Sequence, residues 1–415
     1  ILAGDAFGKS PTRFPIFLFK VAYYLVYLFN FKENWAAYRR RVQGVPETVT
    51  GVKDYAVRTK QTDELENPSN PGRTAPSMPV SKPRPPRTHL ELNYVEADQL
   101  NTWLAASDRH PLAVIAFGHS KVPVVSCPFM TLDLRQLSAP PLVEVWNCDQ
   151  PVHAKRNGEL FFASSGDLAM GVLSCHEKPG ENLDSTTHRA YRQMLTYIRE
   201  QGFPYLWRVW NYFPGINDES GGLERYRQFC IGRHTAFTEM MPDFPASLPS
   251  GTAVGKQSGP LQMYFLSGTH PATPLSNPRQ MNAYEYPEQY GPRSPSFARA
   301  TLCESSGGSQ LFLSGTASVV GHESRHHGFP ELQTQETIEN IRTLLAHAEG
   351  PSHSTNGNRP WDSCYKVYVR HLEQLPVIQR TLHTSPLASS QILYLQGNLC
   401  RRELLVEVEG FITRS

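Results

Sequence analysis

The stretch Leu404–Gly410, LLVEVEG, has the alternating pattern of a β-strand and decides how the core is read. Residues two apart on a strand share a face, so Glu407 and Glu409 lie on one side, and Val406 and Val408 lie on the other. The apolar side predicts packing in a core. Burying an ionised carboxylate without a partner is costly, so the acidic side of a core strand is expected to have a function.

Strand and helix patterns alternate on the N-terminal side of this stretch. Runs of β-branched and aromatic residues predict strands, and apolar residues three to four apart predict helices. Such alternation favours the α/β (α+β) class, with sheets and helices in layers. The predicted strands cover residues 112–117, 142–146, 160–163, 263–266 and 310–313, and the predicted helices cover residues 188–201, 222–236 and 334–348.

The length of the chain and the changes in its local composition predict two domains with an appended segment. The 415 residues have room for two cores of ordinary size. A Pro-rich stretch without apolar periodicity predicts a linker, and the texture changes again near Pro245–Gly251. We therefore predict an appended segment at 1–66, a linker at 67–88, an N-terminal domain at 89–247 and a C-terminal domain at 248–415.

The segment Phe14–Phe31 is almost wholly apolar and aromatic, and basic residues follow it at Arg39–Arg41. Its 18 residues are near the lower limit for crossing a bilayer, so it predicts a short anchor, an interfacial helix or a helix that docks on a partner. The chain starts at Ile1 rather than Met, and a displaced start or a fragment of a neighbouring protein is the competing interpretation. We expect a cytoplasmic protein with at most weak, peripheral membrane contact through residues 14–31.

Composition excludes several function classes. A formal net charge of +2 lacks the concentrated basic surface that nucleic-acid binding needs. Seven cysteines, odd in number and without a CxxC pair, indicate reduced thiols in a cytosolic compartment. We predict no nucleic-acid partner, no metal and no cofactor.

The sequence His322–His326, HESRH, matches the HExxH zinc motif. That motif needs a helix, which places both histidines on one face with the glutamate as base. Here Gly321, Gly328 and Pro330 bracket the match and predict a loop. A zinc hydrolase stays an alternative, and His322 is expected to lie beside the functional site because loop residues at the mouth of a sheet often face a ligand.

Arginine recurs among aromatic residues in two stretches, Trp207–Arg233 and Asn277–Arg299. A planar guanidinium binds a carboxylate with two hydrogen bonds, and aromatic walls hold a flat ring, so both stretches suit a small cyclic polycarboxylate. Surface ion pairs would account for some of these arginines. The candidate binding residues are Arg208, Tyr212, Arg225, Arg233, Tyr284, Arg293 and Arg299.

Five motifs in one order resemble the chorismatases, the enzymes that remove pyruvate from chorismate. The resemblance covers residues 89–415 and implies a C-terminal domain of RidA (YjgF) type, in which two helices back a β-sheet. It implies no cofactor and leaves the oligomeric state open between monomer and trimer. The motifs are RVWNYFPGIN (208–217), GLERYRQFCIGR (222–233), NPRQMNAYEYPEQYGPRSPSFARAT (277–301), LSGTASVVGHESRH (313–326) and CRRELLVEVEG (400–410).

The resemblance implies a role for both acids of the opening stretch. Chorismate carries two carboxylates, and cleavage of its enolpyruvyl ether requires slow protonation of the methylene carbon, hence a positioned general acid. A glutamate half-buried in an apolar strand has a raised pKa and can hold a proton near neutral pH. By resemblance to the last strand of the RidA fold, Glu407 is the implied proton donor and Glu409 is a weaker candidate beside the substrate.

Cys400 and Ala317 are the positions at which the resemblance bears on the product. In the family, a cysteine at the position of Cys400 accompanies formation of 3-hydroxybenzoate, alone or with 4-hydroxybenzoate. Arg401 and Arg402 are expected to lower the pKa of this thiol. Ala317, where glycine would be typical of the 3-hydroxybenzoate type, favours the mixed branch of xanthomonadin-type pigment pathways.

Two further alternatives stay open. A hydrolytic chorismatase would release pyruvate and a dihydroxycyclohexadiene carboxylate. The RidA-like fold also hosts imine hydrolases and proteins that only bind small carboxylates, so the fold alone excludes neither.

Overall fold

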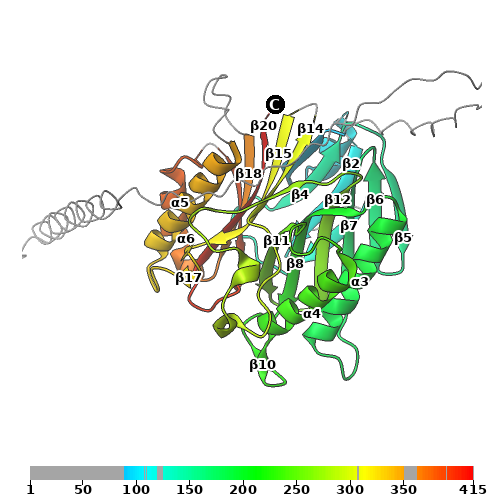
Figure 1. Ribbon diagram of the computed structural model, residues 1–415. Coiled ribbons are helices and arrows are strands. Elements are labelled where there is room, and N and C mark those ends of the chain that lie inside the picture. Colours follow the sequence, from blue (N-terminus) through cyan, green and yellow to red (C-terminus); the bar gives the residue numbers. More distant parts are fainter. Residues whose placement is uncertain are drawn as a thin grey trace, which may run out of the picture. The chain divides into compact units, whose positions relative to one another are not determined.

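The computed structural model describes residues 88–106, 108, 110–118, 125–305, 308–349, 362–388 and 390–414. These residues belong to one compact unit, 81–415, in which helices cover larger sheets (Figure 1). The predicted appendage at 1–66, its apolar stretch 14–31 and nearly all of the predicted linker lie outside the described residues. No helix within the described ranges is long and apolar enough to cross a bilayer.

The first sheet has four strands, ordered β1-β4-β2-β3. Strand β2 is parallel to β3, whereas β4 is antiparallel to β1 and to β2. Its elements are β1 (Leu90–Glu96), α2 (Leu100–Ala106), β2 (His110–Phe117), β3 (Phe129–Leu132) and β4 (Leu142–Cys148).

The second sheet has six strands, ordered β5-β6-β7-β12-β8-β11. Helices α3 and α4 pack together and share a hydrophobic cluster with the sheet. The elements are β5 (His153–Asn157), β6 (Leu160–Ser165), β7 (Leu168–Cys175), α3 (Leu183–Glu200), β8 (Tyr205–Pro214), α4 (Arg225–Met240), β11 (Ser250–Lys256) and β12 (Leu261–Gly268), with the hairpin β9 (Glu219–Ser220) and β10 (Leu223–Glu224) before α4.

The third sheet also has six strands, ordered β13-β14-β15-β20-β18-β19, and is backed by α5 and α6. The hairpin β16–β17 precedes α5. The elements are β13 (Thr273–Leu275), β14 (Ala300–Ser305), β15 (Gly308–Ala317), β16 (Val319–Val320), β17 (Glu323–Ser324), α5 (Pro330–Glu349), β18 (Asp362–Val369), α6 (Leu375–His383), β19 (Gln391–Gln396) and β20 (Val406–Arg414).

All three sheets repeat one strand arrangement. In the two larger sheets the strand order corresponds position by position, and the strands at one edge are parallel in both, β8 with β11 and β18 with β19. The four-stranded sheet reproduces the four strands that end at this parallel edge. In each sheet the last strand in sequence, β4, β12 or β20, is therefore inserted antiparallel between two earlier strands.

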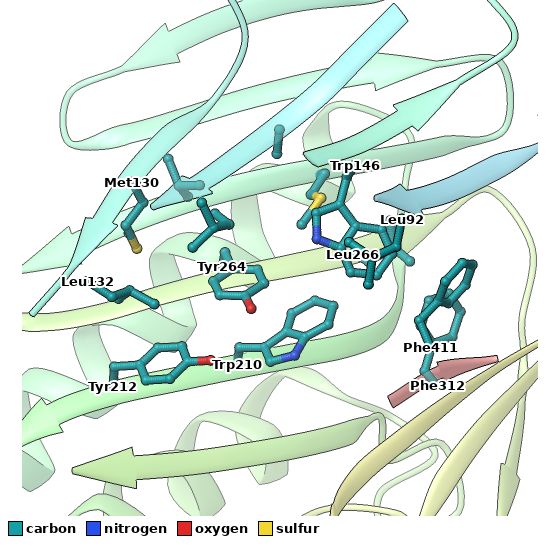
Figure 2. Close-up of a cluster of buried hydrophobic side chains, with 14 of the residues drawn as sticks. Leu92, Met130, Leu132, Trp146, Trp210, Tyr212, Tyr264, Leu266, Phe312 and Phe411 are labelled. Atoms are coloured by element: carbon teal, nitrogen blue, oxygen red, sulfur yellow. The ribbon is translucent and has the colours of Figure 1, made fainter. Parts of the chain in front are cut away.

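These three inserted strands contribute alternate side chains to one shared interior. Figure 2 shows the apolar part of this interior, where the Trp146 ring lies 5.2 Å from Phe411 and 5.5 Å from Trp210. Trp210 in turn stacks on Tyr264 with ring centroids 4.3 Å apart. The inward residues are Glu144 and Trp146 of β4, Tyr264 and Leu266 of β12, and Glu409 and Phe411 of β20.

The opposite face of β20 packs against the helices. Val406 and Val408 are fully buried in a cluster with Ile341 of α5 and Ile378 of α6. The two faces predicted for the LLVEVEG stretch are therefore confirmed.

Every predicted strand and helix is present, with shifted ends. The largest extension is at the start of α3, which begins at Leu183 rather than at residue 188. The expected C-terminal sheet with two helices behind it is confirmed by β13–β20, α5 and α6. The domain division at 247/248 stays a prediction, and β11 and β12, which follow it, pair with β8 and β7.

Substitution of Gly232 by Ala is expected to destabilise the fold although alanine favours helices. A Cβ at Gly232 in α4 would lie 2.1 Å from the backbone oxygen of Asp184 in α3, so the helices must separate. We expect Gly232→Ala to lower the free energy of unfolding by about 2 kcal/mol, measured by chemical denaturation. The control Thr196→Ala, at an exposed position of α3, should change it by less than about 0.5 kcal/mol. Equal stabilities of the two variants would contradict this close packing of α3 and α4.

Candidate active site

A bulge in β15 makes room for the carboxyl group of Glu407. Between Leu313 and Thr316 two residues of β15 lie opposite one residue of β20. The bulged Gly315 has no side chain, and a Cβ there would lie 2.2 Å from Oε1 of Glu407. Its amide donates a hydrogen bond of 3.1 Å to the hydroxyl of Thr252 in β11, so the second and third sheets meet at this point.

A cavity of about 620 Å³ lies in front of Glu407. This volume is in the range of small-molecule sites. Its walls come from the start of α4, the loop between β13 and β14, strand β15 and the segment before β20. The aromatic and cationic lining residues are Tyr226, Tyr286, Tyr290, Phe297, Arg227, Arg299, Arg401 and Arg402.

The carboxyl group of Glu407 is buried and favours the neutral form. The residue is 4% exposed, and within the described residues its carboxyl has no ion-pair partner. Burial, followed by the negative charge of Glu409, raises the pKa of Glu407 to about 8, although Arg208 and Arg370 act in the opposite direction. At neutral pH this group therefore carries a proton that it can donate into the cavity.

Arg401 and Arg299 present guanidinium groups beside aromatic rings. The guanidinium carbon of Arg401 lies 4.0 Å from the ring centroid of Tyr290. Arg299 donates from Nη2 to the Tyr286 hydroxyl at 2.7 Å, and its buried Nε has no hydrogen-bond partner among the described residues. Free donors flanked by aromatic faces suit a carboxylate on a flat ligand.

A small inner pocket of about 30 Å³ adjoins Glu407 and Cys400. Arg233, which is 1% exposed, lines it, and Nε and Nη2 of this side chain lack partners in the described part of the chain. Thr252 also lines it. The pocket has polar groups from Arg233, Thr252 and Glu407 and is large enough for one water molecule.

The thiol of Cys400 is held in the neutral form. Burial and the nearby Glu407 raise its pKa to about 12, although Arg401 acts in the opposite direction. Arg401 thus lowers this pKa as predicted, but burial and Glu407 outweigh its effect, so the expected net lowering is wrong. Both guanidinium groups are engaged elsewhere: Arg401 donates to the His322 carbonyl at 2.9 Å, and Arg402 donates to a backbone carbonyl.

Arg370 fixes the segment that carries Cys400. It follows β18 and is 9% exposed. Its Nε donates to the Leu404 carbonyl at 2.7 Å, and its Nη2 donates to the carbonyls of Leu399 and Arg401 at 3.1 and 2.8 Å. One buried side chain thus sets the path of the segment that leads into β20.

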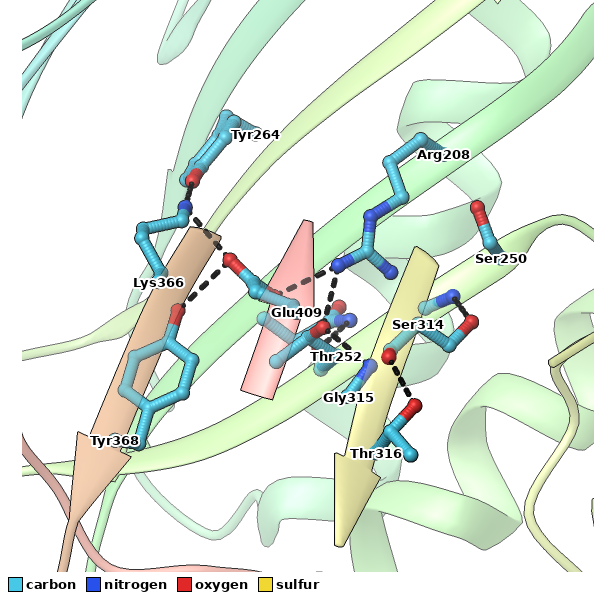
Figure 3. A network of polar contacts seen from close by, with 12 residues as sticks. Arg208, Ser250, Thr252, Tyr264, Ser314, Gly315, Thr316, Lys366, Tyr368 and Glu409 are labelled. Atoms are coloured by element: carbon cyan, nitrogen blue, oxygen red, sulfur yellow. Dashed lines mark hydrogen bonds and ion pairs between the residues drawn. The ribbon is translucent and has the colours of Figure 1, made fainter. Parts of the chain in front are cut away.

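Three predicted residues, Arg208, Tyr212 and Glu409, lie behind the cavity rather than in its lining. Oε2 of Glu409 accepts from Arg208 at 2.7 Å, and Oε1 contacts Lys366 at 2.7 Å and the Tyr368 hydroxyl at 3.0 Å (Figure 3). The Tyr212 hydroxyl lies 2.7 Å from that of Tyr368. Burial opposes ionisation of Glu409, but Lys366 and Arg208 outweigh it and lower the pKa of Glu409.

The other predicted binding residues divide between the cavity and its surroundings. Arg299 and Ala317 line the main cavity and Arg233 the inner pocket. Arg225 pairs with Glu177 at 2.5 Å instead.

Three further predicted residues lie outside the cavity lining. Arg293 is exposed, and Tyr284 packs beside the cluster beneath α3 and α4. His322 acts through a neighbour, because its Nδ1 lies 3.1 Å from the hydroxyl of the lining residue Tyr290.

The HESRH sequence is not helical. Glu323–Ser324 forms β17, and α5 begins only at Pro330, so the predicted loop between strand and helix is confirmed. His326 contacts Glu336 at 3.1 Å, whereas His322 contacts Tyr290. Within the described ranges, no group of three or more His, Cys, Asp and Glu side chains is arranged to hold a metal ion.

Residue spacing did not identify Tyr286, Tyr290 and Arg401 as cavity residues. Tyr290 ends the short 3₁₀ helix Glu288–Tyr290 and Tyr286 precedes it, and the turn between them brings the ring centroids to 5.4 Å. The feature of the sequence that could have indicated them is the spacing of four residues between Tyr286 and Tyr290, with Pro287 after the first.

The fold and cavity define an α/β protein with a buried, proton-bearing carboxyl in a cationic and aromatic pocket. The family model described as "Chorismatase FkbO/Hyg5-like, N-terminal" matches residues 144–267. A 3-hydroxybenzoate synthase of Streptomyces hygroscopicus is 34% identical over 296 residues, which cover 69% of this chain and 85% of that protein. A chorismatase of Streptomyces rapamycinicus is 32% identical over 302 residues, with coverages of 71% and 90%. The chain therefore belongs to the chorismatase family, and the resemblance of its motifs is confirmed.

A crystal structure of a chorismatase agrees with this assignment. It aligns with a TM-score of 0.70 at 29% identity and covers 79% of this chain and 99% of that one. The α/β architecture is thus shared with a family member over most of the chain.

Replacing Glu407 by Gln is expected to stabilise the protein more at pH 8 than at pH 5. The folded state holds a proton up to a pKa of about 8, whereas the unfolded state releases it near 4.5, so stability falls as pH rises between these values. Gln has no such proton. The difference in melting temperature between Glu407→Gln and the parent protein should therefore grow from pH 5 to pH 8. The control Glu373→Gln, at an exposed position, should give a constant difference, and a constant difference for Glu407→Gln would contradict the raised pKa.

Proposed function

We propose that this protein cleaves chorismate and releases pyruvate, with Glu407 as the general acid. The observation that carries the proposal is the neutral carboxyl of Glu407 facing a cavity with arginine and tyrosine walls. The family relatives, one called a 3-hydroxybenzoate synthase and another a chorismatase, support the same substrate.

The first step is transfer of the Glu407 proton to the methylene carbon of the enolpyruvyl ether. A vinyl ether so protonated becomes an oxocarbenium ion, and Glu407 is left as the carboxylate. Protonation of carbon is slow without a positioned acid, and a pKa near the working pH suits such an acid. The glycine at 315 allows the carboxyl to lie at the cavity wall without a competing side chain.

The two carboxylates of chorismate match the cationic lining. Arg299 and Arg401 lie beside the rings of Tyr286 and Tyr290, and these two rings, tilted at 45° to each other, would form an aromatic wall against the cyclohexadiene ring. Bidentate pairing of guanidinium with carboxylate would orient both ends of the substrate.

The product depends on what the oxocarbenium ion meets next. Rearrangement within the ring gives 3-hydroxybenzoate, 4-hydroxybenzoate or both, together with pyruvate, and consumes no net water. We favour this course because Cys400 and Ala317 line the cavity together with Glu407. Since the thiol is neutral, we assign Cys400 a steric and hydrogen-bonding influence on the intermediate rather than nucleophilic attack.

The inner pocket favours a second candidate, hydrolysis. A water molecule there would lie beside Glu407 and Arg233, where the carboxylate formed by proton transfer could accept its proton during attack on the ion. The resulting hemiketal would break down to pyruvate and a dihydroxycyclohexadiene carboxylate, and this course consumes one water.

Glu407→Gln should lower kcat for pyruvate release by about 10²-fold to 10⁴-fold, because an amide cannot donate the proton. Chorismate should still bind, since the shape of the side chain is kept; calorimetry with the variant would measure this. The control Glu373→Gln, remote from the cavity, should turn over normally. Full activity of Glu407→Gln would assign the proton to another group, and intact chorismate with the parent protein would refute the function itself.

Cys400→Ala should change the ratio of products while pyruvate release continues. The thiol lines both the cavity and the inner pocket, so its removal changes the space around the intermediate. Chromatography of the products from chorismate measures the ratio, with Cys364→Ala, a half-buried thiol outside the cavity, as the matched control. An unchanged ratio would assign Cys400 to packing alone.

A further inference from the structure

A network of buried charges lies directly behind the candidate acid. Arg208 and Lys366 carry positive charge, and Glu144 and Glu409 carry negative charge. All four residues are at most 3% exposed. Lys366 lies between the two carboxylates, 2.8 Å from Glu144 and 2.7 Å from Glu409, whereas Arg208 pairs with Glu409 alone.

Two cations, Arg208 and Lys366, thus lie near the site, and Glu409 forms an ion pair with each of them. Glu409 and Glu407 are two residues apart on one face of β20, so their Cα atoms are roughly 7 Å apart. Arg208 could also donate further hydrogen bonds, because its buried Nε and Nη1 have no partner among the described residues. If Glu409 lost its charge, Arg208 would lose its ion-pair partner and Lys366 would keep only Glu144, so a net positive field would act on Glu407.

We propose that Glu409 is a positioning residue that keeps Arg208 and Lys366 neutralised and so keeps the Glu407 carboxyl protonated. This inference rests on the proposed role of Glu407. It gives the second acid of the strand a function that needs no contact with substrate. It also explains why a buried acid can stay neutral although an arginine lies behind it.

The link between Glu409 and the site is also geometric. Nη2 of Arg208 donates to Glu409 and, at 2.5 Å, to the hydroxyl of Thr252. That hydroxyl accepts from the amide of Gly315, the residue on which the Glu407 carboxyl rests. Glu409 thus orients the guanidinium that supports the bulge beside Glu407.

Other ionisable groups face Glu407 from every element packed against it. On the side away from the cavity these groups are Arg208 of β8, Tyr368 of β18, which is in register with Glu407, and Arg370, which follows β18. Tyr226 and Arg233 of α4 and the thiol of Cys400 line the inner pocket.

Charged groups also face Glu407 across the main cavity. They are Arg227, Arg299, Arg401, Arg402, Glu219, Glu224 and Glu403. None of these is altered in the variants below, so their effect is the same in each.

The test is the pH dependence of kcat/KM for pyruvate release in the parent protein, Glu409→Gln, Arg208→Met and the double variant. The alkaline limb of this dependence is the pH range in which kcat/KM falls as Glu407 loses its proton. Glu409→Gln should move the alkaline limb to lower pH by about one unit or more, because Arg208 loses its counter-ion and Lys366 keeps only Glu144. Arg208→Met should move it to higher pH. In the double variant the two changes oppose each other, and the limb should return toward that of the parent protein.

The double variant also keeps the test decisive if Glu409→Gln does not fold. Removing one partner of a buried ion pair destabilises a protein strongly, whereas replacing both is often tolerated. If Glu409→Gln does not fold, comparison of Arg208→Met with the double variant isolates the charge of Glu409. A limb that is equal in these two forms would overturn the proposal, as would a limb of Glu409→Gln at or above that of the parent.

Glu144→Gln is the matched control, because it removes the same charge from the far side of Lys366. Its limb should shift less than that of Glu409→Gln. Equal shifts would overturn the proposal by showing that the total charge of the core, rather than Glu409, protects the proton.

A second readout separates this proposal from the proposed function. Infrared difference spectra between pH 6 and pH 9 should contain a protonated-carboxyl band that Glu407→Gln abolishes. The midpoint of this band should follow the same order among the variants even if chorismate is not the substrate. A band midpoint that is the same in the parent, Arg208→Met and the double variant would refute the positioning role, whatever the activity.

Discussion

The ion pairs of Lys366 are the constraint on which the relation of the three sheets depends. Its ammonium contacts Glu144 of β4 and Glu409 of β20 and donates to the Tyr264 hydroxyl of β12. Burying an ammonium ion costs several kcal/mol unless partners surround it. Only an arrangement that brings all three inserted strands to this point leaves none of these charges uncompensated. The polar layer therefore selects one docking of the sheets, whereas the apolar layer beside it would tolerate several.

That docking also determines where a functional site can form. The second and third sheets approach closely at Thr252 and Gly315, and the bulge in β15 removes a side chain at that point. The space so created lies beside Glu407, which is buried among groups that the network has already neutralised. A carboxyl in such surroundings keeps its proton, because burial penalises its charged form and the negative charge of Glu409 opposes its ionisation.

The sequence predicted the elements well and their contacts only in part. Alternation and helical spacing located the strands and helices, and the two faces of the last strand were correct because they depend on local geometry alone. The separate positions of Arg208 and Arg299 depend on which strands become neighbours across the sheets, which residue spacing does not contain. The raised pKa of Cys400 was missed for the same reason, since burial of a thiol is a property of the packed segment held by Arg370.

The repeated strand arrangement explains why one chain has one acid site. Contacts between Glu144, Tyr264 and Glu409 through Lys366 place these residues of β4, β12 and β20 in one layer. Two residues earlier, the corresponding positions are Leu142, Gln262 and Glu407. The amide of Gln262 is engaged with Lys256 and a backbone carbonyl, and Leu142 has no proton to donate. Of three geometrically similar positions, only that of β20 has a titratable group, and only there does a bulged glycine leave space beside it.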